Sequence, residues 1–180
     1  GKDTAIAIIS AKFGPRAMAV STSDICREET AKHGLPITRE NIFKVANETR
    51  LKNGPGIFGK LAAERIKKHE LPNGVFLVSG IRNPGEVEEL QKAFGKNFVL
   101  IAVDAPFEVR YERVKERSRE GEGVLSFEDF KKSQEKEMKG EAHSQNIGSV
   151  MKMANYTVQN SSDLQEFEEK IEQILKKVMK

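Results

Sequence analysis

Short apolar runs alternate with helical patterns along the chain, and this alternation constrains the fold more than any other feature of the sequence. Four runs, at 16–21, 75–78, 98–103 and 156–159, are typical of short buried strands. The segments between them, and the one at 164–178, carry apolar residues at helical spacing. We therefore predict an α/β fold with a parallel sheet.

The length and charge of the chain narrow its class. A chain of 180 residues suits one domain, 1–180, and its net charge of +3 is too small to indicate nucleic acid or a membrane as a partner. The single cysteine, Cys26, excludes an internal disulfide and fits a reducing cytosol, so we expect a cytoplasmic protein. The three histidines have no spacing typical of a zinc site, and nothing in the sequence indicates the oligomeric state.

The first four residues, Gly1-Lys2-Asp3-Thr4, open an apolar helix that Gly14-Pro15 ends. Glycine and lysine at the start of a helix are typical of the last part of a phosphate-binding loop, where backbone N–H groups receive an anion. Lys2 would reach the β- and γ-phosphates of a nucleotide, and the Thr4 hydroxyl would hold Mg²⁺. The full motif needs a glycine five positions before Gly1 and a strand before that, so we expect the chain to begin inside the motif. An ordinary N-terminal helix with a lysine near its start is the alternative.

Arginine predominates where the predicted strands end. Ligands of parallel α/β sheets bind at the carboxyl ends of strands. The residues that the sequence places there are Asp24 and Arg27, then Ser79, Gly80 and Arg82, then Asp104 with Arg113 and Arg117 one and two helical turns later, and finally Asn160. Because arginine binds phosphate with two parallel hydrogen bonds, this edge suits a polyanion together with a metal ion.

Each of these residues also has a simpler interpretation. Arg110, Arg113 and Arg117 would lie on an exposed helix with weak ion pairs. Asp24 would cap its helix, and Asn160 would only end a strand. These alternatives stay open from the residues alone.

The order of six motifs resembles P-loop nucleotide kinases of the adenylate kinase and dephospho-CoA kinase group, most closely a small archaeal kinase-like branch of uncertain function. The motifs are Gly1–Thr4, Ser23–Glu28, Lys44–Arg50 with Asn53–Gly56, Gly80–Val87, Arg113-x-x-x-Arg117 and Ala154–Asn160. The resemblance implies a three-layer P-loop kinase fold. Its parallel sheet would have five strands, with the first missing from this sequence. It also implies a substrate-binding helical region at about 24–70 and a helical lid at about 112–141.

The resemblance also implies roles for individual residues. The catalytic residues would be Lys2, Asp24, Arg113 and Arg117. ATP would be held by Gly1, Lys2, Asp3, Thr4 and Asn160, and Mg²⁺ by Thr4 and Asp24. Arg27, Arg50 and Arg82 would bind the acceptor. Two departures concern the metal and the lid: Ser79 stands where relatives often have an acidic residue, and the segment 126–138 has lysines and Gln134 where many adenylate kinases have arginines.

These features lead to an expected function and an alternative. We expect an ATP-dependent phosphotransferase that acts on a nucleotide or nucleotide-like small molecule. The alternative is a nucleotide-binding switch or slow ATPase acting on a macromolecular partner, which the two departures favour. An α/β domain without a nucleotide function is a third possibility, and it requires every strand-end arginine to be a surface charge.

Overall fold

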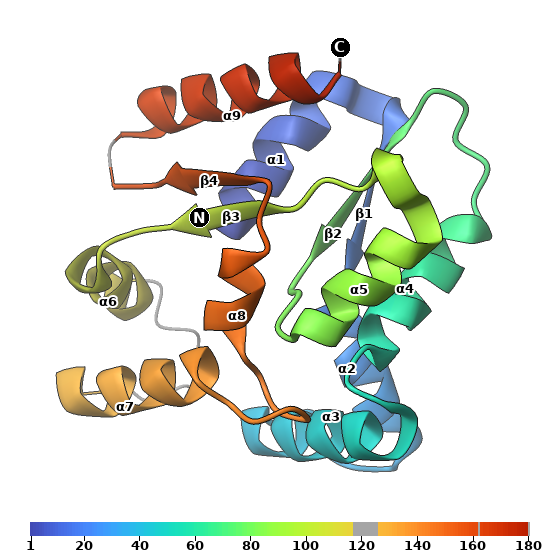
Figure 1. Ribbon diagram of the computed structural model, residues 1–180. Coiled ribbons are helices and arrows are strands. Elements are labelled where there is room, and N and C mark those ends of the chain that lie inside the picture. The colour runs from blue at the N-terminus through green and yellow to red at the C-terminus, as the bar shows by residue number, and fades with distance from the viewer. Residues whose placement is uncertain (117–125, 162, 180) are drawn as a thin grey trace.

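Helices and parallel strands alternate along the chain in the computed structural model, which describes residues 1–116, 126–161 and 163–179 (Figure 1). The strands are β1 (Ala17–Ser21), β2 (Val75–Ser79), β3 (Ile101–Asp104) and β4 (Tyr156–Gln159). The helices are α1 (Lys2–Phe13), α2 (Thr22–Lys32), α3 (Arg39–Asn53), α4 (Ile57–Lys67), α5 (Pro84–Phe94), α6 (Phe107–Glu116), α7 (Phe127–Met138), α8 (Ile147–Lys152) and α9 (Leu164–Val178). The predicted α/β class is confirmed.

The third predicted strand begins later than the sequence pattern indicates. We predicted a start at Phe98, whereas β3 starts at Ile101. Just before it, the backbone N–H of Leu100 donates to the side chain of Asn155 at 2.8 Å, and the Leu100 carbonyl accepts from the Asn155 N–H at 2.9 Å. An asparagine side chain therefore takes the place of a strand partner here, which the apolar pattern could not reveal.

Within the described residues, the four strands form two separate pairs. β1 is parallel to β2, with Ala17 opposite Val75 and Ser21 opposite Ser79. β3 is parallel to β4 in the same way. The structure therefore contains two small parallel sheets where we predicted one sheet of five strands. A cavity of about 770 Å³ has β2 along one side and β3 along the other, and helices α1, α5, α8 and α9 also line it.

The helices form layers on the two faces of the strands (Figure 1). On one face, Phe13 of α1 packs with Phe167 and Ile171 of α9 in one apolar cluster. On the other face, Phe58 of α4 and Leu90 of α5 form a second cluster, and both of these side chains are fully buried. The layered arrangement agrees with the three-layer part of the prediction.

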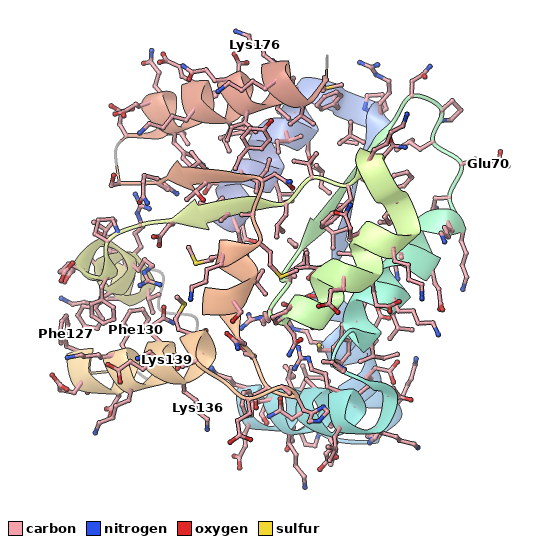
Figure 2. All side chains as sticks on the ribbon, viewed as in Figure 1. Glu70, Phe127, Phe130, Lys136, Lys139 and Lys176 are labelled. Carbon is pink, nitrogen blue, oxygen red and sulfur yellow. The ribbon has the colours of Figure 1, made fainter. Side chains whose placement is uncertain are left out.

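Helices α6 and α7, which belong to the predicted lid, are joined by aromatic rings. Phe107 and Tyr111 of α6 contact both Phe127 and Phe130 of α7, with ring centroids 5.1–5.6 Å apart. Figure 2 shows Phe127 and Phe130 directed from α7 toward α6. The predicted lid also includes residues 117–125, which lie outside the described residues. In the part of the chain that is described, no helix combines the length and the apolar character that crossing a bilayer requires.

Candidate functional site

The start of α1 lies against the carboxyl ends of β3 and β4. A Cβ atom added to Gly1 would come within 2.7 Å of Asn160 Nδ2 and 2.8 Å of Val103 Cγ1, so only glycine fits this approach. Because the first N–H groups of a helix have no partner within the helix, this position favours an anion. The structure therefore places Gly1 and Asn160 side by side at one strand edge.

Lys2 stands at this helix start with an exposed amine. Its Nζ is 2.7 Å from Oδ1 of the adjacent Asp3, and the two side chains are 52% and 63% exposed. An ion pair this exposed contributes little stability, so an incoming phosphate can replace the Asp3 carboxylate. Thr4, two residues on, is half-buried in the first turn of the same helix.

Arg113 reaches the same edge from α6. Its Nη1 donates to the carbonyl of Asn160 at 2.8 Å, and the Asn160 N–H donates to the carbonyl of Asp104 at 2.7 Å. Arg110 instead donates from Nη1 to Gln134 of α7 at 2.8 Å. Arg113 is thus held at the ends of β3 and β4, whereas Arg110 connects the two lid helices. Arg117, which we predicted to be catalytic, lies outside the described residues.

Asp24 and Arg27 form an ion pair at the start of α2. Arg27 Nη1 is 2.7 Å from Asp24 Oδ1, with the side chains 43% and 62% exposed. The simpler interpretation of Asp24 as the helix cap is wrong, because Ser21 is the cap and its hydroxyl accepts from the Asp24 N–H at 3.2 Å. The Asp24 carboxylate is therefore not needed for capping.

The turn after β2 lies close to the start of α2. Thr22 donates from its hydroxyl to the carbonyl of Gly80 at 2.7 Å. Gly80 has φ +81°, a conformation that favours glycine, and a Cβ there would come within 2.8 Å of the hydroxyls of Thr22 and Ser23. This contact brings the segment with Asp24 and Arg27 next to the segment with Arg82.

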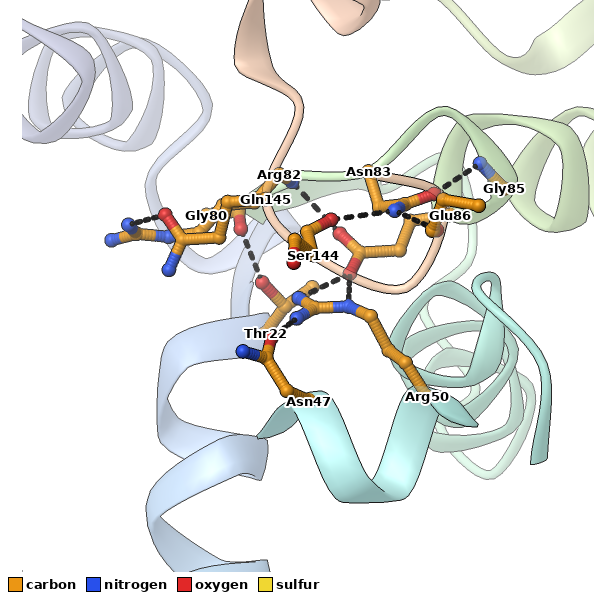
Figure 3. A network of polar contacts seen from close by, with 11 residues as sticks. Thr22, Asn47, Arg50, Gly80, Arg82, Asn83, Gly85, Glu86, Ser144 and Gln145 are labelled. Atoms are coloured by element: carbon orange, nitrogen blue, oxygen red, sulfur yellow. Dashed lines mark hydrogen bonds and ion pairs between the residues drawn. The ribbon is translucent and has the colours of Figure 1, made fainter. Parts of the chain in front are cut away.

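Arg82 belongs to a polar network that connects α3, α5 and the segment after α7 (Figure 3). Its backbone N–H donates to Glu86 Oε2 at 2.8 Å, and its Nη1 donates to Gln145 Oε1 at 2.8 Å. Glu86 Oε1 also accepts from Nε and Nη2 of Arg50, at 3.2 and 2.9 Å. The Glu86 carboxylate is therefore a shared anchor for two arginines.

Arg50 is located differently from the prediction that it binds the acceptor. Only 2% of the residue is exposed, and its guanidinium lies 5.0 Å from the centre of the Phe58 ring. The Glu86 carboxylate and the Phe58 ring both contact the guanidinium of Arg50. The contacts of this side chain therefore lie inside the protein core. The helical spacing does place Arg50 on the face of Ile42 and Ala46, but the pattern could not reveal Glu86 as its buried partner.

Glu86 is the functional candidate that the sequence did not reveal. Its side chain is fully buried, and burial raises its pKa, whereas the Arg50 guanidinium and the N–H donors act in the opposite direction. The one available signal was its place in the first turn after Asn83-Pro84, where an acidic residue is ordinary. Gln145, which binds Arg82 from 63 positions away, had no signal in the sequence.

The described residues contain no cluster of three or more His, Cys, Asp or Glu side chains suited to a metal ion. Mg²⁺ usually keeps several waters and binds one or two protein oxygens together with substrate phosphates. Hydroxyl and carboxylate oxygens at the helix starts, from Thr4 and Asp24, are hard ligands of the kind that Mg²⁺ prefers. The donor set therefore fits Mg²⁺ bound together with a nucleotide, and does not fit a metal held by protein alone.

One cavity connects the two groups of residues. Lys2 at the start of α1, Arg82 after β2 and Glu137 of α7 all line the space of about 770 Å³ between β2 and β3. Arg82 Nη1 is 3.8 Å from Glu137 Oε2, and Glu137 also binds Arg39 of α3 at 3.1 Å. Lys2, which we predicted to bind the donor phosphates, and Arg82, which we predicted to bind the acceptor, therefore line the same cavity.

Comparisons with known proteins identify the family of the chain. Residues 1–131 match the AAA_17 family, which is described as an AAA domain. The chain is 42% identical over 180 residues to a UPF0200/UPF0201 protein of Archaeoglobus fulgidus, and this match covers 100% of the chain but 53% of that relative. The chain thus spans about half the length of this relative.

Other archaeal relatives are closer to this chain in length. A UPF0200 protein of Thermococcus onnurineus is 35% identical over 162 residues, which are 89% of this chain and 84% of the relative. One of Methanosarcina mazei is 31% identical over 152 residues, 84% of this chain and 77% of the relative. None of these names specifies a substrate or the adenylate kinase or dephospho-CoA kinase group. The chain belongs to the UPF0200 family and carries a P-loop kinase-like domain of the AAA_17 family.

Proposed function

We propose that this protein is an ATP-dependent phosphotransferase that acts on a nucleotide or a nucleotide-like small molecule. The observation that carries the proposal is the shared cavity, which has Lys2 at the helix start of α1 and Arg82 at the end of β2. A donor phosphate on Lys2 and an acceptor phosphate on Arg82 would face each other at the end of that space, beyond the carboxyl ends of β2 and β3. Phosphoryl transfer requires mainly this positioning together with neutralisation of charge.

Each strand-end residue has a role in this proposal. The N–H groups at the start of α1 and the Lys2 amine bind the donor phosphates. Thr4 and Asp24 would hold Mg²⁺ together with the nucleotide, and the ion would neutralise charge at the transferring phosphate. Arg27 and Arg82 bind the acceptor phosphate, and Arg113, held on Asn160, approaches from the lid side.

We further propose that a fifth parallel strand occupies the part of the cavity that lies between β2 and β3, and leaves the end beyond their carboxyl ends to the phosphates. Each of these two strands has one neighbour among the described residues, so one edge of each faces the cavity. The cavity is lined by the whole of β2 and also by Lys2. A strand ending there would lead into the phosphate loop at Gly1, as the predicted P-loop requires.

Enzyme assays with Mg·ATP test the function. Nucleoside monophosphates and dephospho-CoA form the acceptor panel, and we expect turnover of at least one acceptor, which Lys2→Ala abolishes. Lys12→Ala is the matched control, because this lysine lies on the same helix but binds Glu172 of α9 at 2.9 Å. Protein that binds ATP but phosphorylates no acceptor contradicts the proposal.

A nucleotide-binding switch or slow ATPase is the second candidate. The pairing of Ser21 with Ser79 favours the switch or slow ATPase. Because β1 and β2 both end in serine, these two strand ends supply no carboxylate to a metal ion. ATP hydrolysis measured with and without RNA or ribosomal particles separates the two functions. Hydrolysis that rises with such a partner, without phosphorylation of a small acceptor, supports the switch.

A further inference from the structure

The segment between α7 and α8 encloses the turn that carries Arg82. Asn83 donates from Nδ2 to the carbonyls of Ala142 and Ser144, each at 2.8 Å. The Asn146 N–H donates to the Arg82 carbonyl at 2.7 Å. Figure 3 shows Gln145 beside the Arg82 side chain and Ser144 beside Asn83. The position of the Arg82 backbone is therefore set jointly by α5 and by the segment at 142–146.

The Arg82 guanidinium is held by a neutral side chain. Gln145 Oε1 accepts from Nη1 at 2.8 Å, whereas the nearest carboxylate, from Glu137, is 3.8 Å away. A glutamine oxygen uses one of the five guanidinium N–H donors and adds no negative charge, so only the ion pair with Glu137 at 3.8 Å offsets the charge of the arginine among the described residues. The remaining donors stay available to an anion, because the Arg82 side chain is 32% exposed and lines the cavity.

We propose that Gln145 is a positioning residue that directs the Arg82 guanidinium toward the acceptor phosphate. The inference rests on the proposed function, in which Arg82 binds that phosphate. An arginine side chain has many rotamers, and fixing it in advance removes an entropic cost from anion binding. A carboxylate in the same place would fix the arginine equally well but would compete with the phosphate for its charge.

The same fold contains a matched control. Gln134 of α7 binds Arg110 with the same atoms and the same distance, 2.8 Å, as Gln145 binds Arg82. Arg110 lies between the two lid helices and is not among the residues that line the cavity. Changing Gln134 therefore tests the loss of one glutamine–arginine hydrogen bond without touching the proposed anion site.

The test measures the Nε–Hε NMR signal of Arg82, assigned with Arg82→Lys, during titration with inorganic phosphate. Gln145→Leu keeps the side-chain volume but removes the acceptor oxygen, so we expect a shifted Arg82 signal and roughly tenfold weaker phosphate binding. Gln145→Glu keeps the acceptor oxygen, so the signal stays close to its original position while phosphate binding weakens. Gln134→Leu leaves both the Arg82 signal and phosphate affinity unchanged.

The outcomes separate the inference from the proposed function. If phosphate shifts Arg82 in the parent protein but Gln145→Leu changes neither the signal nor the affinity, Gln145 is not a positioning residue and the proposed function stands. If phosphate shifts the backbone amide of Lys2 but never the Arg82 signal, both the inference and the acceptor role of Arg82 are wrong. Thermal unfolding of each variant verifies that the fold is retained.

Discussion

Glu86 joins three parts of the chain through one carboxylate. It accepts two hydrogen bonds from Arg50 of α3 and one from the N–H of Arg82, at distances of 2.8–3.2 Å. A buried carboxylate is stable only where such partners surround it, and removing one partner leaves an uncompensated charge. The ion pair thus fixes how α3 lies against the turn that carries Arg82.

Replacing Glu86 will reveal the size of this effect. We expect Glu86→Gln to lower the free energy of unfolding by about 3 kcal/mol, because Arg50 then stays buried without a counter-charge. Glu88→Gln is the control, since Glu88 lies on the exposed face of the same helix. Urea denaturation measures both variants. The double variant Arg50→Met, Glu86→Gln will lose less than the sum of the single losses, and strict additivity contradicts the pairing.

Cys26 gives the protein a pH dependence in the alkaline range. Burial raises the pKa of its thiol from 9.0 to about 12, so the folded state keeps a proton that the unfolded state loses. The contribution of Cys26 to the free energy of unfolding is therefore fully present below pH 9. It decreases as the pH rises toward 12, by up to about 1.4 kcal/mol per pH unit. Cys26→Ala removes this component. Equal pH slopes for parent and variant between pH 9 and 11 contradict the raised pKa.

At the scale of elements, α4 and α5 approach each other more closely than side chains normally allow. A Cβ atom on Gly59 of α4 would lie 2.4 Å from the carbonyl oxygen of Glu86, and one on Gly56 would lie 2.5 Å from that of Gly85. Gly59 on α4 and Gly56 just before it therefore let this helix contact the backbone at the start of α5. This contact supports the same turn that holds Glu86 and Arg82.

The close contact reverses the usual effect of an alanine substitution. Gly→Ala inside a helix ordinarily stabilises a protein by roughly 0.5–1 kcal/mol. We expect Gly59→Ala to destabilise it by about 1–3 kcal/mol, because the added methyl group pushes α4 away from α5. Lys60→Ala, on the exposed face next to it, is the control. Thermal unfolding distinguishes the two, and a higher Tm for Gly59→Ala contradicts the packing.

The elements could be predicted from the sequence where one local pattern determines them. Helix α9 begins and ends at Leu164 and Val178 as predicted, because apolar side chains recur on one face throughout. The strand-end arginines Arg82 and Arg113 were also identifiable, since parallel strands end at a common edge. The partner of the buried Arg50 was not identifiable, because Glu86 lies 36 positions away. The bond between Arg82 and Gln145 was not either, because it spans 63 positions.

At the scale of the whole molecule, two small parallel sheets face each other across a cavity. β1–β2 and β3–β4 are each parallel pairs, and about 770 Å³ separates β2 from β3. Apolar side chains of α1, α5 and α9 line much of this space, and apolar surface left uncovered costs roughly 25 cal/mol per Å². Among the described residues, β2 and β3 each have one edge without a partner strand, and such edges beside apolar side chains suit a further strand.

Joining a strand to the chain tests this arrangement. We compare the 180-residue chain with a longer chain that carries an added N-terminal extension. The extension consists of an apolar strand followed by a glycine that stands five positions before Gly1. A parallel strand in the cavity would pair with both β2 and β3, so the longer chain should have a higher Tm. Amide hydrogen exchange should slow at Val75–Ser79 and Ile101–Asp104, because their free edges gain partners.

The control carries the same extension with a proline at the middle of the added strand. Proline lacks the N–H that a central strand must donate, so this variant should lose the gain in Tm and in exchange protection. Nucleotide binding discriminates further, since the glycine and Gly1 would then form one continuous phosphate loop. Slower exchange at β2 and β3 without tighter ATP binding would establish the strand but contradict the loop. Unchanged exchange at both strands would mean that the two parallel pairs are not halves of one sheet.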